Sequence, residues 1–334
     1  MTKSWEFLQD SVDTTAYYAG RSKIVLWEGE TGAIANLAES VKHLNHAAQN
    51  WRRGKPLWGR QGIVVNLMGS LKVTLYGGDR FGINCTALVP NEASDIPAFW
   101  QYAVSGELEA NIREIHPKVN LSSGVVLDLP FDRDHWQMMA EAADPLPEPE
   151  SDDPTQWLFR GEISVASHPL QVAVARLLGY RWPDQVADAL DAHGDADGIV
   201  ALVPLPHEPD AATRLRALLS VAYGDAWSTD LERALVTAEG GRTGRLDDWL
   251  RETFFAQHVK LFDNRPFLWH LWDGHKDGGF SVIVNYHRLD HATLNKLTHT
   301  VLGAWIERQT EATAAGVTGA DLRLAAAKNL QERL

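Results

Sequence analysis

One stretch rich in proline and acid, residues 141–157, most constrains how this chain can fold. It reads EAADPLPEPESDDPTQW, with four prolines and six acidic residues. Proline lacks a backbone N–H and restricts the residue before it, so such a stretch continues neither a helix nor a sheet. We therefore predict a linker over residues 143–156. It would divide the chain into a first domain, residues 1–142, and a second, residues 157–334.

The residue patterns differ on the two sides of this linker. In the first domain, apolar and β-branched runs between glycine turns predict strands at residues 23–27, 62–68, 71–76, 82–89 and 125–129, and helical spacing predicts helices at 33–51, 94–104, 107–115 and 131–142. In the second domain, helices are expected at 170–178, 211–223, 229–238, 246–262, 290–311 and 320–334. One β-hairpin is expected at 266–287, after the break at Asn264-Arg265-Pro266. The fold class is α+β: a mixed α/β domain with a small antiparallel sheet, then a mainly helical domain.

Cysteine usage and hydropathy indicate a reducing, aqueous compartment. The 334 residues include one cysteine, Cys85, which lies in a strand-like run and is expected to be buried and unreactive. The N-terminal MTKSWEFLQD lacks the apolar segment of a signal peptide, and no apolar run approaches the roughly 20 residues of a membrane span. We expect a cytoplasmic protein without a membrane partner.

Charge is distributed unevenly, although the net charge is −13. Residues 42–80 hold seven cationic residues and one acid, Asp79, whereas residues 141–153 hold six acids and residues 184–210 hold seven, without any base. The basic segment includes the aromatic loop WRRGKPLWG. Cations neutralise phosphates, arginine can also read guanine edges, and flat rings can stack on bases. The segment therefore predicts DNA contacts, which we assign to Arg52, Arg53, Lys55, Trp58, Arg60, Lys72 and Arg80; the alternative is a solvated face with inward-packed tryptophans.

Catalytic motifs are not found. The sequence has no phosphate-binding glycine loop, no GxSxG elbow and no CxxC pair. His287 and His291 flank Asp290, but Asp290 is better explained as a helix N-cap. His258, His270 and His275 are interpreted as structural. A hydrolase using the His258–His291 histidines remains a third hypothesis, and we expect no metal or cofactor in this chain.

Long aromatic-rich runs carry a resemblance to a known family. They include WRRGKPLWGRQGIVVNLMGSLKVTLYGGDRFGINCTALVPNE, AFWQYAVSGELEANIREIHPKVNLSSGVVLDLPFDRDHW, WLRETFFAQHVKLFDNRPFLWHLWDG and VNYHRLD. Over most of its length the chain resembles the region that follows the catalytic domain in large bacterial DNA N6-adenine methyltransferases. These are the type IIG restriction–modification enzymes and their relatives in BREX/Pgl-type phage-exclusion systems.

The resemblance implies the target-recognition and C-terminal helical parts of such an enzyme. The family's S-adenosylmethionine motif is absent, and Asn264-Arg265-Pro266-Phe267 lacks the first proline of its adenine-pocket motif. The chain alone is therefore expected to be catalytically inactive, with S-adenosylmethionine bound by a catalytic partner or missing domain. Expected partners are double-stranded DNA and that methyltransferase subunit or domain, and we expect a split subunit, a truncated product or a fragment. The alternative is a module that docks on a separate methylase without contacting DNA.

Overall fold

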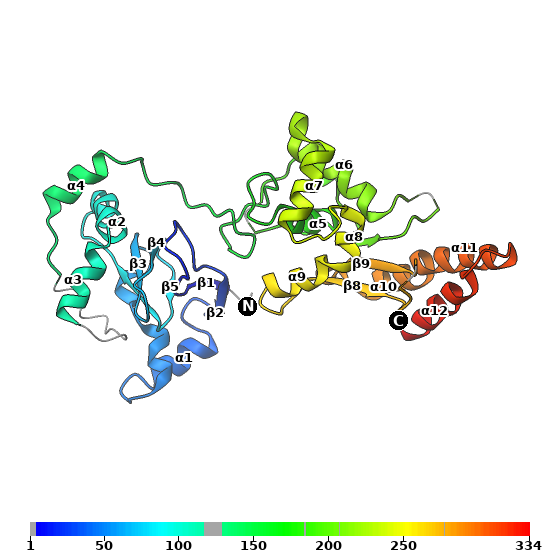
Figure 1. The fold of residues 1–334 in the computed structure, drawn as a ribbon. Coiled ribbons are helices and arrows are strands. Elements are labelled where there is room, and N and C mark those ends of the chain that lie inside the picture. The colour runs from blue at the N-terminus through cyan, green and yellow to red at the C-terminus, as the bar shows by residue number, and fades with distance from the viewer. Residues whose placement is uncertain (1–4, 117–128, 184, 207, 277) are drawn as a thin grey trace. The chain divides into compact units, whose positions relative to one another are not determined.

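The structure is a computed structural model that describes residues 5–116, 129–183, 185–206, 208–276 and 278–334. The chain forms two compact units, Met1–Ser151 with Gln156–Phe159, and Asp152–Thr155 with Arg160–Leu334 (Figure 1). The change from one unit to the other falls at the end of the predicted linker. Helices and small three-stranded sheets occur in both units, which confirms the α+β class.

Unit 1 combines two small sheets with short helices. Its elements are β1 (Trp5–Gln9), β2 (Lys23–Leu26), α1 (Ala33–Ser40), η1 (Ala47–Arg52), η2 (Lys55–Leu57), β3 (Gly62–Asn66), β4 (Val73–Tyr76), β5 (Arg80–Phe81), β6 (Cys85–Leu88), η3 (Ala93–Asp95), α2 (Ile96–Val104), α3 (Glu107–Ile115) and α4 (Arg133–Glu141). The strand orders are β2-β1-β5 and β4-β3-β6. The first sheet contains a parallel pair, β1 with β5, and the second is antiparallel throughout.

Strand β3 is the centre of unit 1, because both of its faces are buried. Ile63 and Val65 pack with Trp100 of α2 and Trp136 of α4. Val64 faces the other way, into a second cluster with Phe81 and other residues. All five β3 residues are buried, as expected for a central strand covered on both faces.

Two predictions for unit 1 are wrong. Residues 5–9 form β1, where no strand was expected, because β1 gains its hydrogen-bond partners from β2 and from β5, some 70 residues away. The helix expected over residues 33–51 is α1 followed by η1. Helix α1 ends at Ser40, and η1 begins after His46, whose ring accepts a hydrogen bond from Ala48 N. The expected strand at 125–129 falls on residues 125–128, outside the described residues, and on Leu129, which is not in a strand.

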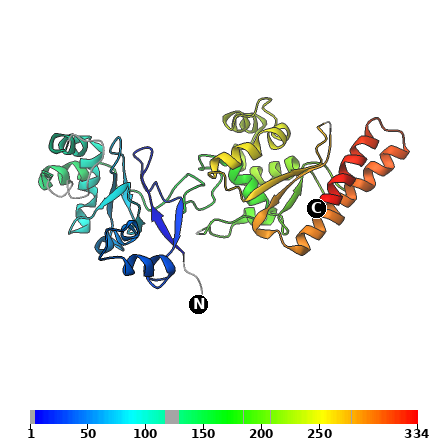
Figure 2. The ribbon, with the colours of Figure 1, turned by 90° about the horizontal axis from the view of Figure 1, so that it is seen from below.

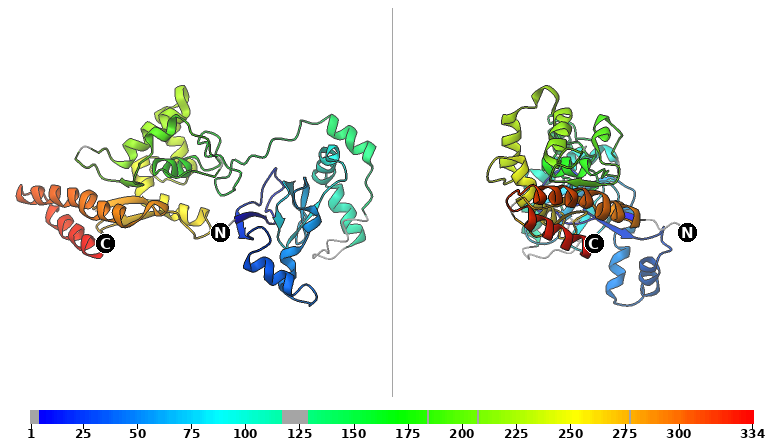
Figure 3. Two further views of the ribbon diagram at one scale, coloured as in Figure 1. Left: turned by 180° about the vertical axis from the view of Figure 1, so that it is seen from behind. Right: turned by 90° about the vertical axis from the view of Figure 1, so that its right-hand side faces the viewer.

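Unit 2 is mainly helical around one three-stranded sheet. Its elements are α5 (Pro169–Leu177), η5 (Ala189–His193), β7 (Ile199–Ala201), α6 (Ala211–Tyr223), η6 (Gly224–Ala226), α7 (Thr229–Ala238), α8 (Leu246–Glu252), α9 (Phe254–Leu261), β8 (Leu268–Trp272), β9 (Ser281–Asn285), η7 (Tyr286–Arg288), α10 (His291–Asn295), η8 (Lys296–Val301), α11 (Leu302–Ala314) and α12 (Ala320–Arg333). Helices α11 and α12 lie side by side (Figures 2 and 3). Val282 and Val284 of β9 pack with Leu302 and Trp305 of α11.

The predicted hairpin is present as β8 and β9, but it belongs to a larger sheet. Strand β7, which was not predicted, pairs with β9 on the side away from β8. The helix expected over 246–262 is divided at Thr253 into α8 and α9. This break lets Trp249 and Phe254 both lie in the interior, with their rings 5.5 Å apart. Among the described helices, none has the length and apolar character needed to cross a membrane.

Candidate nucleic-acid interface

The basic loop between α1 and β3 consists of η1 and η2 joined at Gly54. Gly54 has a φ of +69°, and a Cβ atom there would lie 2.0 Å from the Phe81 ring. Any other residue would strain the backbone and clash with this ring. Gly54 therefore allows the loop to pack closely against β5.

Arg80 is buried beneath this loop, between two tryptophans. Its Cζ lies 3.9 Å from the Trp27 ring centroid and 3.8 Å from that of Trp58, and the two rings meet edge to face. Its Nε donates to Glu6 at 2.8 Å, and only 9% of the side chain is exposed. Burial lowers the pKa of Arg80, and Glu6 opposes this effect. Two of the predicted DNA contacts, Arg80 and Trp58, thus support the interior of unit 1 in this structure.

Arg52 and Lys55 are paired with acids near α1. Lys55 Nζ lies 2.7 Å from Glu30 Oε2, and Arg52 contacts the Glu39 carboxylate. The hydrogen bond from Lys55 lowers the pKa of Glu30. These pairs are partly exposed, and such pairs typically contribute less than about 1 kcal/mol. Both cations are therefore neutralised within the chain, although weakly.

A pocket of about 330 Å³ lies between α1 and the loop that carries these cations. Trp27 and Trp58 line it, together with both ion pairs and Asn36. A second pocket, of about 420 Å³, borders Trp58 and Arg80 and is also lined by Trp5 and Phe7. Trp58 thus lines both pockets.

The other three predicted cations have no carboxylate within ion-pair distance among the described residues: Arg53, Arg60 and Lys72. Arg53 Nη1 donates to the Ile83 carbonyl at 3.0 Å, and Arg60 Nη2 donates to the Pro90 carbonyl at 2.8 Å. A carbonyl orients a guanidinium but leaves its charge available to an anion.

Two of these cations, Arg53 and Lys72, lie at one end of the sheet β4-β3-β6, and Arg60 lies at the other end. At the Asn66 end, Lys72 O accepts from Asn66 N, and Asn84, next to Ile83, accepts from Leu67 N. Arg53 and Lys72 therefore flank the end of β3 from its two sides. Arg60 is at the other end, because its partner Pro90 follows β6 beyond the Ile63–Leu88 pair. The sequence analysis had assigned all three to one set of DNA contacts and did not separate the two ends.

Arg113 of α3 joins the Asn66 end, and sequence reasoning missed it. Its Nη2 donates to the Gly69 carbonyl in the β3–β4 turn, and it lies 3.8 Å from Glu109. Met68 and Ile83 are more than half exposed at this same end. We call this group the sheet-end cluster: Arg53, Lys72, Arg113, Met68 and Ile83. Lys72 and Arg113 are 41 residues apart in the sequence. Only the packing of α3 beside the sheet brings these two residues together.

Cys85 is fully buried, as predicted. Burial raises the pKa of its thiol to about 12, so the reactive thiolate form is suppressed. Its Sγ is 3.9 Å from the carbonyl oxygen of Gln9. The residue fills the core between β6 and β1.

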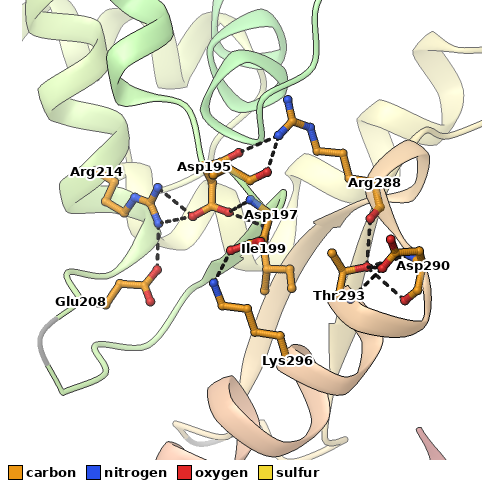
Figure 4. A network of polar contacts seen from close by, with 10 residues as sticks. Asp195, Asp197, Ile199, Glu208, Arg214, Arg288, Asp290, Thr293 and Lys296 are labelled. Atoms are coloured by element: carbon orange, nitrogen blue, oxygen red, sulfur yellow. Dashed lines mark hydrogen bonds and ion pairs between the residues drawn. The ribbon is translucent and has the colours of Figure 1, made fainter.

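In unit 2, the acid-rich stretch before α6 is held by cations from distant elements (Figure 4). Arg214 of α6 bonds Asp195 at 3.1 Å and Glu208 at 2.8 Å. Arg288 of η7 donates to the Ala196 carbonyl in this stretch and to the Gly179 carbonyl at 2.8 Å, and Lys296 of η8 pairs with Asp197. These contacts tie the stretch to α6, η7 and η8, and its acids Asp195, Asp197 and Glu208 are partners of two of the three cations.

Asp290 and His258 have structural roles. Asp290 accepts from Thr293 N at 2.8 Å, which confirms it as the cap of α10. His258 is fully buried with both ring nitrogens in hydrogen-bonding contact. Within the part of the chain that the structure describes, no three histidine, cysteine or acidic residues are grouped as a metal would require.

Neither any protein-family model nor any curated protein matches this chain.

Proposed function

We propose that this chain is the DNA-recognition portion of a site-specific adenine DNA methyltransferase of a restriction–modification or phage-defence system. The family resemblance of the sequence motivates the proposal. The structural observation that carries it is the sheet-end cluster, where Arg53 and Lys72 have no carboxylate partner among the described residues and flank one end of β3.

The chemistry of this cluster suits a DNA duplex. Cations supply the sequence-independent attraction to phosphates, and an arginine can bond the edge of a guanine with two hydrogen bonds. The exposed Met68 and Ile83 offer apolar contacts of the kind that thymine methyl groups make. Backbone contacts to Ile83 and Gly69 fix two of the guanidiniums in place, which reduces the entropy lost on binding.

In this proposal methyl transfer occurs on a catalytic partner or domain, which binds S-adenosylmethionine and receives the extruded adenine. The chain itself acts in the cytoplasm as the specificity element, and methylation by this chain alone is expected to be absent.

The test is fluorescence anisotropy with a labelled duplex at 50–200 mM salt, comparing two double variants of equal charge change. Arg53→Ala with Lys72→Ala removes unpaired cations, and Arg52→Ala with Lys55→Ala removes acid-paired ones as the matched control. At about 0.9 per phosphate contact, the first variant should reduce the slope of log K against log salt by roughly 2, and the control by less. Equal slopes in both variants and the wild type would refute the assignment of this surface.

A specific observation also favours the alternative, docking on a methylase without DNA contact. Strand β8 is at the edge of its sheet, and Trp269 and Trp272 on it are 42% and 47% exposed. Exposed tryptophans on an edge strand are typical of protein interfaces. Co-purification of a methylase that Trp269→Ala and Trp272→Ala abolish, with no duplex binding by the wild-type chain, would support this alternative.

A further inference from the structure

The pocket between α1 and the basic loop has aromatic walls and a charge-balanced rim. Trp27 and Trp58 line it, and its volume of about 330 Å³ is at the lower end of the range for small-molecule sites. It can therefore hold a ligand of one or two rings, and not a large one.

The charges around this pocket select against a strongly charged ligand. Glu30 is paired with Lys55 and Glu39 with Arg52, so its four charged residues cancel formally. A ligand that enters the pocket therefore meets hydrogen-bond donors and acceptors, and the charged groups around it have no net charge. A neutral and polar ring fits this environment better than a phosphate or an ammonium group.

Hydrogen-bonding capacity remains unused in the walls. Asn36 donates through Nδ2 to the Thr31 carbonyl at 2.8 Å, and its Oδ1 is left as an acceptor at an exposed position. The indole Nε1 atoms of Trp27 and Trp58 are buried and have no acceptor among the described residues. These two N–H groups have almost no accessible surface, and Trp27 is only 2% exposed. A ligand therefore meets Asn36 Oδ1 and the half-buried Trp58 directly.

We propose that this pocket binds a nucleobase, as an unpaired base or a free nucleoside. A purine or pyrimidine is flat and neutral, stacks on indole, and carries ring nitrogens and carbonyl oxygens that accept hydrogen bonds. Exocyclic amino groups can donate to Asn36 Oδ1. Binding of an unpaired base in a single strand would extend the proposed DNA recognition and rests on that proposed function. Binding of a free nucleoside does not depend on it.

The experiment titrates the full chain into 2-aminopurine riboside and into a single-stranded oligonucleotide with one 2-aminopurine. Stacking on an indole quenches this fluorophore, so saturable quenching is expected. Quenching of the riboside alone assigns a free nucleoside, and stronger quenching within the strand assigns an unpaired base; either supports the pocket.

Two variants and one control locate the site. Asn36→Leu changes an exposed wall residue, and Trp58→Phe keeps a flat ring but offers a smaller surface for stacking. Each should weaken binding by about tenfold, the loss expected for one hydrogen bond or for part of a stacking contact. Ser40→Leu, an exposed α1 position outside the pocket lining, should leave it unchanged. If circular dichroism shows that Trp58→Phe unfolds the protein, the binding measured with Asn36→Leu tests the site.

Two results would overturn the proposal: no saturable quenching of either probe, or equal binding by Asn36→Leu and Ser40→Leu. Its failure is separable from that of duplex recognition, because Arg53→Ala with Lys72→Ala leaves the pocket lining intact. That variant should lose duplex affinity and keep riboside binding.

Discussion

Acid should destabilise unit 2 through His258, whose imidazole is fully buried. Nδ1 lies 3.2 Å from Gln171 Oε1, and Leu268 N donates to Nε2 at 3.2 Å. The ring is therefore neutral, with its proton on Nδ1. A second proton on Nε2 would face the N–H of Leu268 and would lose that hydrogen bond. His258 thus joins α9, α5 and the start of β8 only in its neutral form.

Burial lowers the pKa of His258 to about 3, whereas an unfolded histidine titrates near 6.5. Between these values the unfolded chain binds the proton and the folded chain does not, so the stability is present above pH 6.5 and is lost as pH falls. At 1.36 kcal/mol per unit, the loss is roughly 2 kcal/mol at pH 5. This is a sizeable fraction of a typical domain stability of about 5–15 kcal/mol.

The assay is urea unfolding of the full chain at pH 7, 6 and 5, for wild type, His258→Gln and His299→Gln. His258→Gln keeps hydrogen-bonding groups but does not titrate, so the advantage of the wild type over it should shrink by roughly 2 kcal/mol from pH 7 to pH 5. His299 is exposed in the same unit and makes none of the His258 contacts, so His299→Gln is the matched control. An advantage of the wild type that is constant with pH would refute the reasoning.

Three further predictions concern charges and caps. Glu30→Gln releases Lys55 from its ion pair, so the affinity for duplex DNA should rise by a few-fold in the anisotropy assay, and an unchanged affinity would show that Lys55 is not used. Glu239 raises the pKa of His168 by a hydrogen bond, so this pair stabilises unit 2 below the ordinary histidine pKa and the effect is lost as pH rises. The difference in unfolding free energy between wild type and Glu239→Gln should therefore fall between pH 5 and pH 9, opposite in sign to His258. Asp210→Ala removes the side chain that caps α6 and should cost about 1 kcal/mol in urea unfolding; a cost near zero would show that water replaces the cap.

Local sequence patterns were sufficient to predict the bounds of elements whose hydrogen bonds form within the element itself. The helices expected at residues 107–115, 211–223 and 229–238 have these bounds in the structure. Asp210 and Ser228 cap two of them through side-chain hydrogen bonds. Helical hydrogen bonds join residues four apart, so caps and apolar spacing within a short window determine them. The burial of Cys85 and the cap role of Asp290 were predicted on the same basis and are confirmed.

The tertiary structure alone decided which charges of the basic segment remain available. The sequence identified the segment as cationic, but Arg80 is buried against Trp27 and Trp58, and Lys55 pairs with an acid 25 residues earlier. Arg113 reached the sheet end from α3. Strands β1 and β7 were likewise missed, because each has a partner strand more than 70 residues away, β5 for β1 and β9 for β7. Pairing between distant segments depends on which surfaces pack together in the folded chain. A short window of sequence does not contain that information.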